Sequence, residues 1–374
     1  MRRSLLVAAL AAVLPGAAGA QGALGLQGYG YPTGQIGSAA LALGGANAEI
    51  DPASALNPAS IGMLSRYSVY MQYEPEFRTT RFGGASDKTT TIRFPAFMLA
   101  GGFGRFTAGL SATTLLDRSW TNIVSDSQLV GGEMIPSTLT AASAGALTDA
   151  RFAASYWVSP KLLVGAGLSA LIGQNRVRFG RTFPDSTGVG DVVQSSTINF
   201  SGSALSAGVV WIPSDAFVVG LSARSGGALE ATQGEVTLGE GNAPSRYGLT
   251  LAYTGIPNTT ISGRFDHTAW SKMDALGGPQ MSTFDANEIG LGLEVLGPRI
   301  GGAPSLARIG VRDRTLPFGV NGDKVSERGF SGGVGIPVAR GRGQIDLSIQ
   351  RATRSAGGAS EKAWNLSIGL GIRP

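Results

Sequence analysis

The stretch NEIGLGLEVLG, residues 287–297, decides the fold class of this chain. Apolar side chains occupy every second position, at Ile289, Leu291, Leu293 and Val295, and two glycines and a glutamate lie between them. A period of two places one set of side chains on one face of a β-strand. The stretch AWNLSIGLGI, residues 363–372, repeats the pattern near the other end of the chain. Both stretches therefore predict amphipathic strands.

Similar alternation continues from about residue 67 to the C-terminus and predicts a closed sheet. The partner face carries mostly Gly, Ser, Thr and Asn, which suits a wet and crowded lumen, so the apolar face would look outward into lipid. Closure leaves no unpaired strand edge in hydrocarbon. We expect an all-β fold, a transmembrane antiparallel β-barrel of about fourteen strands. The strands are centred near residues 70, 93, 109, 150, 169, 203, 224, 250, 264, 291, 309, 332, 347 and 368.

Turn signals of two kinds separate the predicted strands. Short proline turns at residues 159–161, 212–215 and 255–258 are expected on the periplasmic side of the membrane. The polar stretches 117–143, 181–196 and 228–245 are long enough to predict extended loops on the outer side.

The composition excludes several classes of protein. The chain has 57 glycines and only 15% charged residues, which disfavours a soluble bundle of helices. A formal charge of +5, dispersed along the chain, does not predict nucleic-acid binding. Cysteine is absent and His267 is the single histidine, so no metal site or thiol chemistry is expected. No Gly-x-Ser-x-Gly match and no glycine-rich loop stands in the strand-to-helix context that a nucleophile elbow or a nucleotide site needs, and we expect no cofactor and no enzymatic activity.

The N-terminus has the three parts of a secretory signal peptide. Arg2 and Arg3 precede an apolar run over residues 5–14, and the small residues Ala18 and Ala20 mark a cleavage site. We therefore assign residues 1–20 to a signal peptide that is cleaved after Ala20. The alternative is a membrane anchor that stays attached, which needs a longer apolar run.

Three further segments carry a resemblance to a known family. They are GGANAEIDPASALNPASIGML (residues 44–64), a strand-turn-strand unit that ends in Asp-x-x-x-Trp-Ser (residues 244–273), and a closing run over residues 308–354. In this order they resemble the FadL-type family of outer-membrane transporters for long-chain fatty acids and hydrocarbons. The resemblance implies a fourteen-stranded barrel, plugged by an N-terminal hatch, that carries hydrophobic molecules by passive diffusion.

The resemblance divides the mature chain into a hatch, residues 21–64, and a barrel, residues 65–374. Asn57, Pro58 and Ala59 match the N-terminal signature of the family, and the proline is expected to fix a bend where the hatch meets the first strand. The alternative is a surface loop that caps the barrel, because Pro and Gly also punctuate ordinary loops.

Charged residues on the inner face are the candidate ligand site. Alternation places Arg264 and Asp266 in the lumen, with His267 on the outer face, and places Arg246, Arg308 and Arg312 on the inner side of their strands. Lumen cations would attract a carboxylate headgroup. The alternative is a structural network of these cations with Asp266 and Glu294.

These inferences predict a channel in the outer membrane of a Gram-negative-type bacterium. It would take up hydrophobic small molecules such as long-chain fatty acids and contact outer-membrane lipid and lipopolysaccharide as a monomer. The alternative function is a non-transporting barrel of the same family that anchors or shuttles secreted proteins. A soluble periplasmic β protein is the third alternative.

Overall fold

The computed structural model describes residue 24 and residues 29–64, 67–82, 85–276, 283–300, 303–319 and 322–373. The predicted signal peptide, residues 1–20, lies outside the described residues. The wall is formed by β2 (Ser68–Phe82), β3 (Ala85–Arg93), β4 (Ala96–Phe103), β5 (Phe106–Asp117), β6 (Trp120–Val130), β7 (Glu133–Ser159), β8 (Leu162–Thr182), β9 (Val192–Ser214), β10 (Phe217–Gln233), β11 (Val236–Asn242), β12 (Ser245–Ile256), β13 (Thr259–Ala269), β14 (Ala286–Ile300), β15 (Ala303–Thr315), β16 (Ser326–Val338), β17 (Gly343–Ala356) and β18 (Ala359–Ile372).

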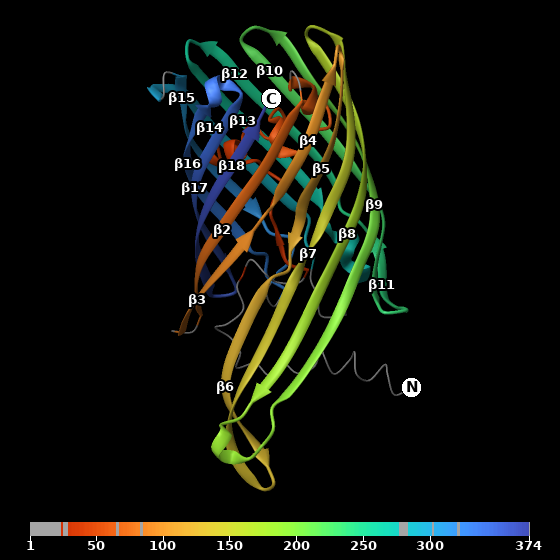
Figure 1. The fold of residues 1–374 in the computed structure, drawn as a ribbon, viewed down its shortest axis with the longest axis vertical. Helices are drawn as coiled ribbons and strands as arrows, with labels where there is room; N and C mark the ends of the chain where they lie inside the picture. The colour runs from red at the N-terminus through yellow and green to blue at the C-terminus, as the bar shows by residue number, and fades with distance from the viewer. Residues whose placement is uncertain are drawn as a thin grey trace.

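The described strands form a closed antiparallel barrel with fourteen positions in its wall (Figure 1). Three positions are each filled by two strands in line, namely β3 with β4, β5 with β6, and β11 with β12. The barrel closes where β18 pairs with β2, with Leu370 opposite Met71. The predicted fold class is confirmed, and each of the fourteen predicted strand centres falls in a different wall position.

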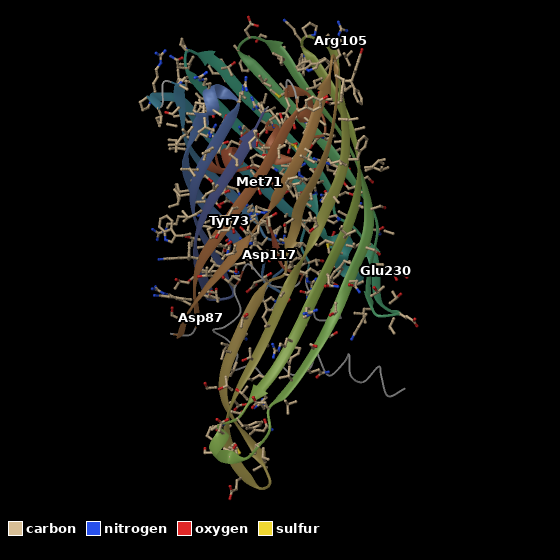
Figure 2. The ribbon with its side chains drawn as sticks, in the orientation of Figure 1. Met71, Tyr73, Asp87, Arg105, Asp117 and Glu230 are labelled. Atoms are coloured by element: carbon tan, nitrogen blue, oxygen red, sulfur yellow. The ribbon has the colours of Figure 1, made fainter. Side chains whose placement is uncertain are left out.

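The two faces of the wall divide the side chains as the period of two predicts. Leu291 and Leu366 are 57% and 39% exposed on the outer surface, and Ser367 is buried inside. Figure 2 shows Met71 and Tyr73 of β2, which lie on the same outer face. Aromatic side chains border this apolar surface near the short connections, at Tyr67, Phe103, Phe106, Tyr156, Trp211, Phe217 and Tyr253. The surface therefore has the apolar band and aromatic rim of a membrane barrel.

The long stretches expected as outer loops are mostly strands. β6 and β7 form a hairpin over the first of them, β8 and β9 bracket the second with the short helix η4 (Asp185–Thr187), and β10 with β11 covers the third. β7 has 27 residues and β13 has 11, whereas about ten residues cross a bilayer. The sheet of β6 to β9 therefore projects beyond the barrel (Figure 1). Cross-strand hydrogen bonds extend the hairpins where composition alone suggested loops.

Of the predicted hatch, residues 21–64, residues 29–64 lie inside the barrel and are called the hatch below, and residues 21–23 and 25–28 lie outside the described residues. The hatch contains β1 (Tyr31–Pro32), the helix α2 (Ser38–Ala42) and the short helices η2 (Pro52–Ser54) and η3 (Ser60–Met63). α2 contacts β15 to β18, and η3 contacts β5 and β7 to β9. Two further short helices, η5 (Trp270–Leu276) and η6 (Ala339–Gly341), lie in connections of the wall. None of the helices in the described ranges is long and apolar enough to cross a membrane.

Candidate functional site

Asn57 fixes the hatch to the wall of the barrel. Its side-chain amide donates to the backbone oxygens of Glu49 at 2.9 Å and Val209 at 3.0 Å, and its side-chain oxygen accepts from the backbone N–H of Ala59 at 2.9 Å. The wall approaches closely at Gly208, where an added Cβ would lie 1.9 Å from the Asn57 side-chain oxygen. Asn57 therefore docks the hatch on β9. The sequence predicted a bend at Pro58 but not this role of Asn57.

A second wall glycine makes room for the residues next to Asn57. A Cβ at Gly165 of β8 would lie 2.5 Å from the Ala59 nitrogen and 2.6 Å from the Pro58 carbonyl carbon. Ala59 is fully buried against Leu163 and Val210 of the wall. The signature Asn57, Pro58 and Ala59 is thus a packing surface between the hatch and strands β8 and β9.

Glu49 is the charged anchor of the hatch. Its carboxylate is fully buried, is ion-paired with Arg246, lies 3.3 Å from Arg264 Nε and accepts from the Ser222 hydroxyl at 2.6 Å. Burial by itself would raise the pKa of this carboxyl, but the two guanidinium groups and the Ser222 hydroxyl hold the pKa below its usual range. The Glu49 carboxylate therefore carries its charge inside the lumen at neutral pH.

Glu49→Gln is expected to loosen the hatch at neutral pH. A folded-state pKa below the unfolded one stabilises the docked hatch above the unfolded value of about 4.3, and this stabilisation is lost as the pH falls through the folded pKa. The variant should expose residues 29–64 to protease at pH 7, while the wild-type hatch becomes equally sensitive only in acid. Equal protease resistance of both proteins at every pH would contradict this role for Glu49.

The predicted lumen cations are all ion-paired. The Asp266 carboxylate is ion-paired with Arg246 at 2.6 Å and with Arg264 at 3.0 Å, which joins three predicted residues and Glu49 in one cluster. Arg308 lies apart, 2.6 Å from both Glu294 and Asp346. Arg312 is joined to the Asp266 cluster through Glu288, which lies 3.6 Å from Arg312 and 2.5 Å from Arg264, and Arg312 also lies 3.5 Å from Glu327. His267 of the outer face is hydrogen-bonded to Asn287 at 2.8 Å. These contacts favour the structural network over a free headgroup site.

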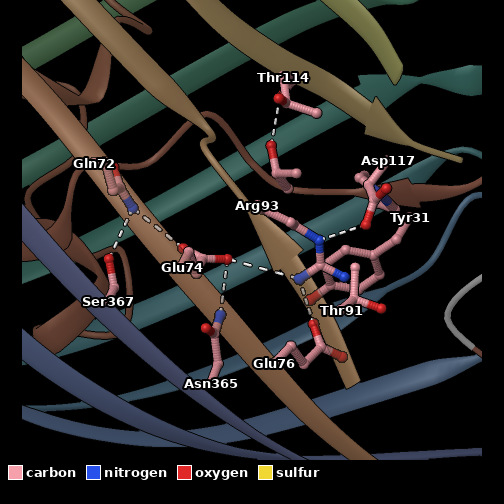
Figure 3. A network of polar contacts seen from close by, with 12 residues as sticks. Tyr31, Gln72, Glu74, Glu76, Thr91, Arg93, Thr114, Asp117, Asn365 and Ser367 are labelled. Atoms are coloured by element: carbon pink, nitrogen blue, oxygen red, sulfur yellow. Dashed lines mark hydrogen bonds and ion pairs between the residues drawn. The ribbon is translucent and has the colours of Figure 1, made fainter. Parts of the chain in front are cut away.

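A larger network around Arg354 and Tyr31 was not found from the sequence. Arg354 is 1% exposed and bonds Glu76 at 2.9 Å and Glu327 at 2.5 Å, and it also pairs with Glu361. Tyr31 of the hatch lies with its ring centroid 4.4 Å from the Arg354 guanidinium. Figure 3 shows Tyr31 beside the adjoining Arg93, which bonds Asp117 at 2.5 Å. Alternation in the sequence places Glu76 and Arg354 on the inner face. Their pairing, however, depends on closure of the barrel.

Apolar side chains fill the lumen on the far side of the hatch from the short connections. Residues of the wall, of the hatch and of the connections, including the helix η5, form this apolar chamber. It comprises Tyr29, Leu115, Leu116, Leu147, Leu171, Phe200, Leu229, Ala231, Ala243, Trp270, Met273, Leu276 and Phe318. The buried side chains of η5 recur every third residue, at Trp270, Met273 and Leu276. This spacing is a helical signal in the sequence, and a period of two does not detect it. The chamber is the largest of the buried apolar clusters among the described residues.

Two cavities lie on opposite sides of the hatch. The first, about 50 Å³, is bordered by Arg246, Arg264 and Trp270, and so lies between the charged cluster and the apolar chamber. The second, about 380 Å³, lies toward the short connections and is bordered by Ile50, Val218 and Arg308. The hatch therefore separates the two cavities, and the first is too small for a drug-sized ligand without rearrangement.

The wall is interrupted beside the hatch. β4 gives way to β3 at Pro95, and β5 gives way to β6 after Asp117. Past these two points, β3 pairs only with β2 and β6 pairs only with β7 among the described strands, so β3 and β6 are not paired with each other. β1 of the hatch pairs with the freed edge of β5, with Tyr31 opposite Asp117. The hatch thus covers the inner side of a gap between β3 and β6.

No family model matches the sequence, and no curated protein matches it. A FadL homologue from Pseudomonas aeruginosa has a similar structure, with a TM-score of 0.61 and 11% identity over 95% of this chain and 99% of that chain. The fold is of the FadL type. Other barrels of this type include the toluene transporter TodX of Pseudomonas putida, with a TM-score of 0.55 and 14% identity over 93% of this chain and 99% of that chain.

A third FadL-type barrel extends the comparison. The toluene transporter TbuX of Ralstonia pickettii has a TM-score of 0.51 and 16% identity over 90% of this chain and 98% of that chain. In all three comparisons the alignment covers nearly the whole of both chains. The likeness establishes the FadL-type fold of this chain.

Proposed function

We propose that this chain is a channel of the bacterial outer membrane that takes up small hydrophobic molecules passively. The apolar chamber carries this proposal, because the largest apolar cluster among the described residues is a site where a hydrophobic ligand gains affinity. Burial contributes about 25 cal/mol per Å² of apolar ligand surface. Two of the structures with a similar fold are toluene transporters, which supports the same function.

The arrangement of the hatch suggests a route through the protein. A ligand would enter the apolar chamber from the side of η5 and displace the side chains of Trp270 and Met273. The lumen beyond is closed by the hatch and by ion pairs, so the gap between β3 and β6 offers a lateral exit. Long-chain fatty acids and hydrocarbons would both fit an apolar chamber. Because the predicted lumen cations are paired with carboxylates of the protein, a hydrocarbon is better supported as the ligand than a fatty acid.

Leu171→Gln is expected to reduce ligand binding and uptake. Leu171 is fully buried in the apolar chamber, and a glutamine there costs about 2 kcal/mol of apolar transfer, equivalent to a loss of affinity of about 30-fold. The measurement is entry of a fluorescent hydrocarbon into liposomes that contain the purified barrel. Ile172→Gln is the matched control, since Ile172 lies next in β8 on the outer face. Equal uptake by Leu171→Gln and wild type would exclude the chamber as the ligand site.

The projecting sheet supports a second candidate function. β6 pairs with β7 along one edge, and its other edge pairs with no described strand, so backbone groups are open to an added strand. A barrel that anchors a secreted protein would use such an edge. Purification from native membranes would then recover one protein in equal amount with the barrel, and liposomes containing the barrel would take up no hydrocarbon.

A further inference from the structure

One sector of the outer wall changes from apolar to cationic along a common line. On β17, β18, β2 and β3, the outward side chains nearer to the short connections are apolar, as at Ile349, Leu366 and Ile92. Toward the end with the projecting sheet, the same faces carry only hydroxyls and cations. These outward residues are Arg351, Thr353, Ser355, Ser360, Lys362, Thr79, Arg81, Ser86, Lys88 and Thr90.

Strand register brings four cations of this sector together. Lys362 lies opposite Thr79, and Thr79 lies opposite Lys88, so the two lysines share one row across β18, β2 and β3. Arg351 and Arg81 lie one diagonal step from this row, since Arg351 pairs with Trp364 and Arg81 pairs with Ser360. Diagonal neighbours in a sheet are about 7–8 Å apart. Arg351, Lys362, Arg81 and Lys88 are hereafter the cationic patch.

The cationic patch lacks carboxylate partners. All four side chains are exposed, and none forms an ion pair with a residue in the described ranges. Acidic side chains of the same four strands point inward, as with Glu76 and Glu361. Figure 2 places Asp87 at the end of β3, and its register partner Thr80 also belongs to the inner face. Arg328 on the adjoining β16 differs, because it is paired with Asp313 at 2.8 Å.

Aromatic side chains mark the border between the apolar surface and the cationic patch. Trp364 lies directly opposite Phe77, and the Arg351 guanidinium is 5.3 Å from the centroid of the Trp364 ring. Trp and Phe at such a border lie at the level of lipid headgroups. Cations immediately beyond the border therefore meet the charged groups of the headgroups, not the acyl chains.

We propose that the cationic patch binds the phosphate groups of a phosphorylated lipid whose acyl chains lie against Ile349 and Leu366. Guanidinium and ammonium groups form charge-assisted hydrogen bonds with phosphate oxygens, and the neighbouring Ser and Thr hydroxyls donate additional bonds. This site rests on the membrane location of the barrel and does not depend on transport of a hydrophobic ligand.

The test compares two quadruple variants by native mass spectrometry in a non-ionic detergent. The patch variant is Arg351→Gln, Lys362→Gln, Arg81→Gln and Lys88→Gln. The control variant is Arg105→Gln, Lys161→Gln, Arg340→Gln and Arg342→Gln, which removes four exposed cations from the short connections at the opposite end. The probes are diphosphoryl lipid A, the same glycolipid after enzymatic removal of its phosphates, and inorganic phosphate.

The wild type and the control variant should bind the phosphorylated glycolipid about tenfold more tightly than the dephosphorylated one, and the patch variant should lose this preference. Equal losses in both variants, or no loss in either, would overturn the site. Binding of inorganic phosphate as strong as that of the lipid would assign the patch to free anions instead. If the patch variant does not fold, the wild-type comparison of the two glycolipids decides. Uptake by liposomes is measured separately, so failure of the lipid site leaves the channel proposal intact.

Discussion

Arg354→Met should destabilise the barrel more than any other single substitution considered for this chain. The guanidinium of Arg354 is buried between Glu76, Glu327 and Glu361, and its removal leaves these carboxylates in the lumen with fewer cations. Breaking a buried ion pair by removing one partner costs about 3–5 kcal/mol, because the remaining charge is uncompensated. Methionine keeps most of the volume, so the loss reports on charge.

The free energy of unfolding can be measured by guanidinium titration of the barrel in detergent micelles, with the shift in gel mobility on heating as the readout of folding. Arg351→Met is the matched control, since Arg351 lies three residues away in β17 on the exposed outer face and contributes about 1 kcal/mol or less. The double variant Arg354→Met with Glu361→Gln should recover part of the loss, because it also removes one of the unpaired carboxylates. Equal stability of Arg354→Met and Arg351→Met would show that the network contributes no stability.

Gly208→Val should release the hatch while the barrel stays folded. The Asn57 side-chain oxygen occupies the space that a side chain at position 208 would need, so the hatch must move away from β9. This movement breaks the hydrogen bond from Asn57 to the Val209 oxygen and strains the bonds to Glu49 and Ala59. A loss of about 3 kcal/mol raises the undocked fraction of the hatch about 100-fold.

Ion conductance of single barrels in a planar bilayer measures the release, because an undocked hatch leaves a water-filled lumen. A chain without residues 29–64 gives the fully open reference. Gly263→Val is the matched control, since the nearest atom to a Cβ at Gly263 is Leu291 Cδ2 at 3.4 Å on the outer face. The role assigned to Asn57 fails if Gly208→Val conducts no more than Gly263→Val and its hatch remains resistant to protease.

The hatch and the charged lumen differ in how far they could be predicted. Alternation placed Arg246, Arg264, Arg308 and Arg312 on the inner face, and all four are buried there. Of their partners, the structural-network alternative named Asp266 and Glu294, which pair with Arg246, Arg264 and Arg308. The partners of Arg312 and the large network around Arg354 were not predicted. Arg354 and Glu76 are 278 residues apart and meet only because β18 closes on β2. Long-range ion pairs of this kind depend on the strand order and register of the whole barrel.

The connecting segments show the same limit in another form. The residues of β6 and the first part of β7 are polar and contain Pro136 and two adjacent glycines, so they predicted a loop. They form strands because antiparallel pairing with β8 satisfies their backbone groups over many residues. The helix η5 was not predicted, because its buried residues Trp270, Met273 and Leu276 are spaced by three in a short stretch, and a search for alternation does not detect that spacing.

The sequence by itself determined the fold class, the number of wall positions and the face on which each side chain lies. The reason is local: successive residues of a strand point to opposite sides, so a period of two is visible without knowing the neighbours. Only the tertiary structure decided which charges pair, how Asn57 and Glu49 hold the hatch, and where the apolar chamber and the cationic patch form. These features arise between residues that are distant in sequence, and barrel closure alone brings them within contact distance.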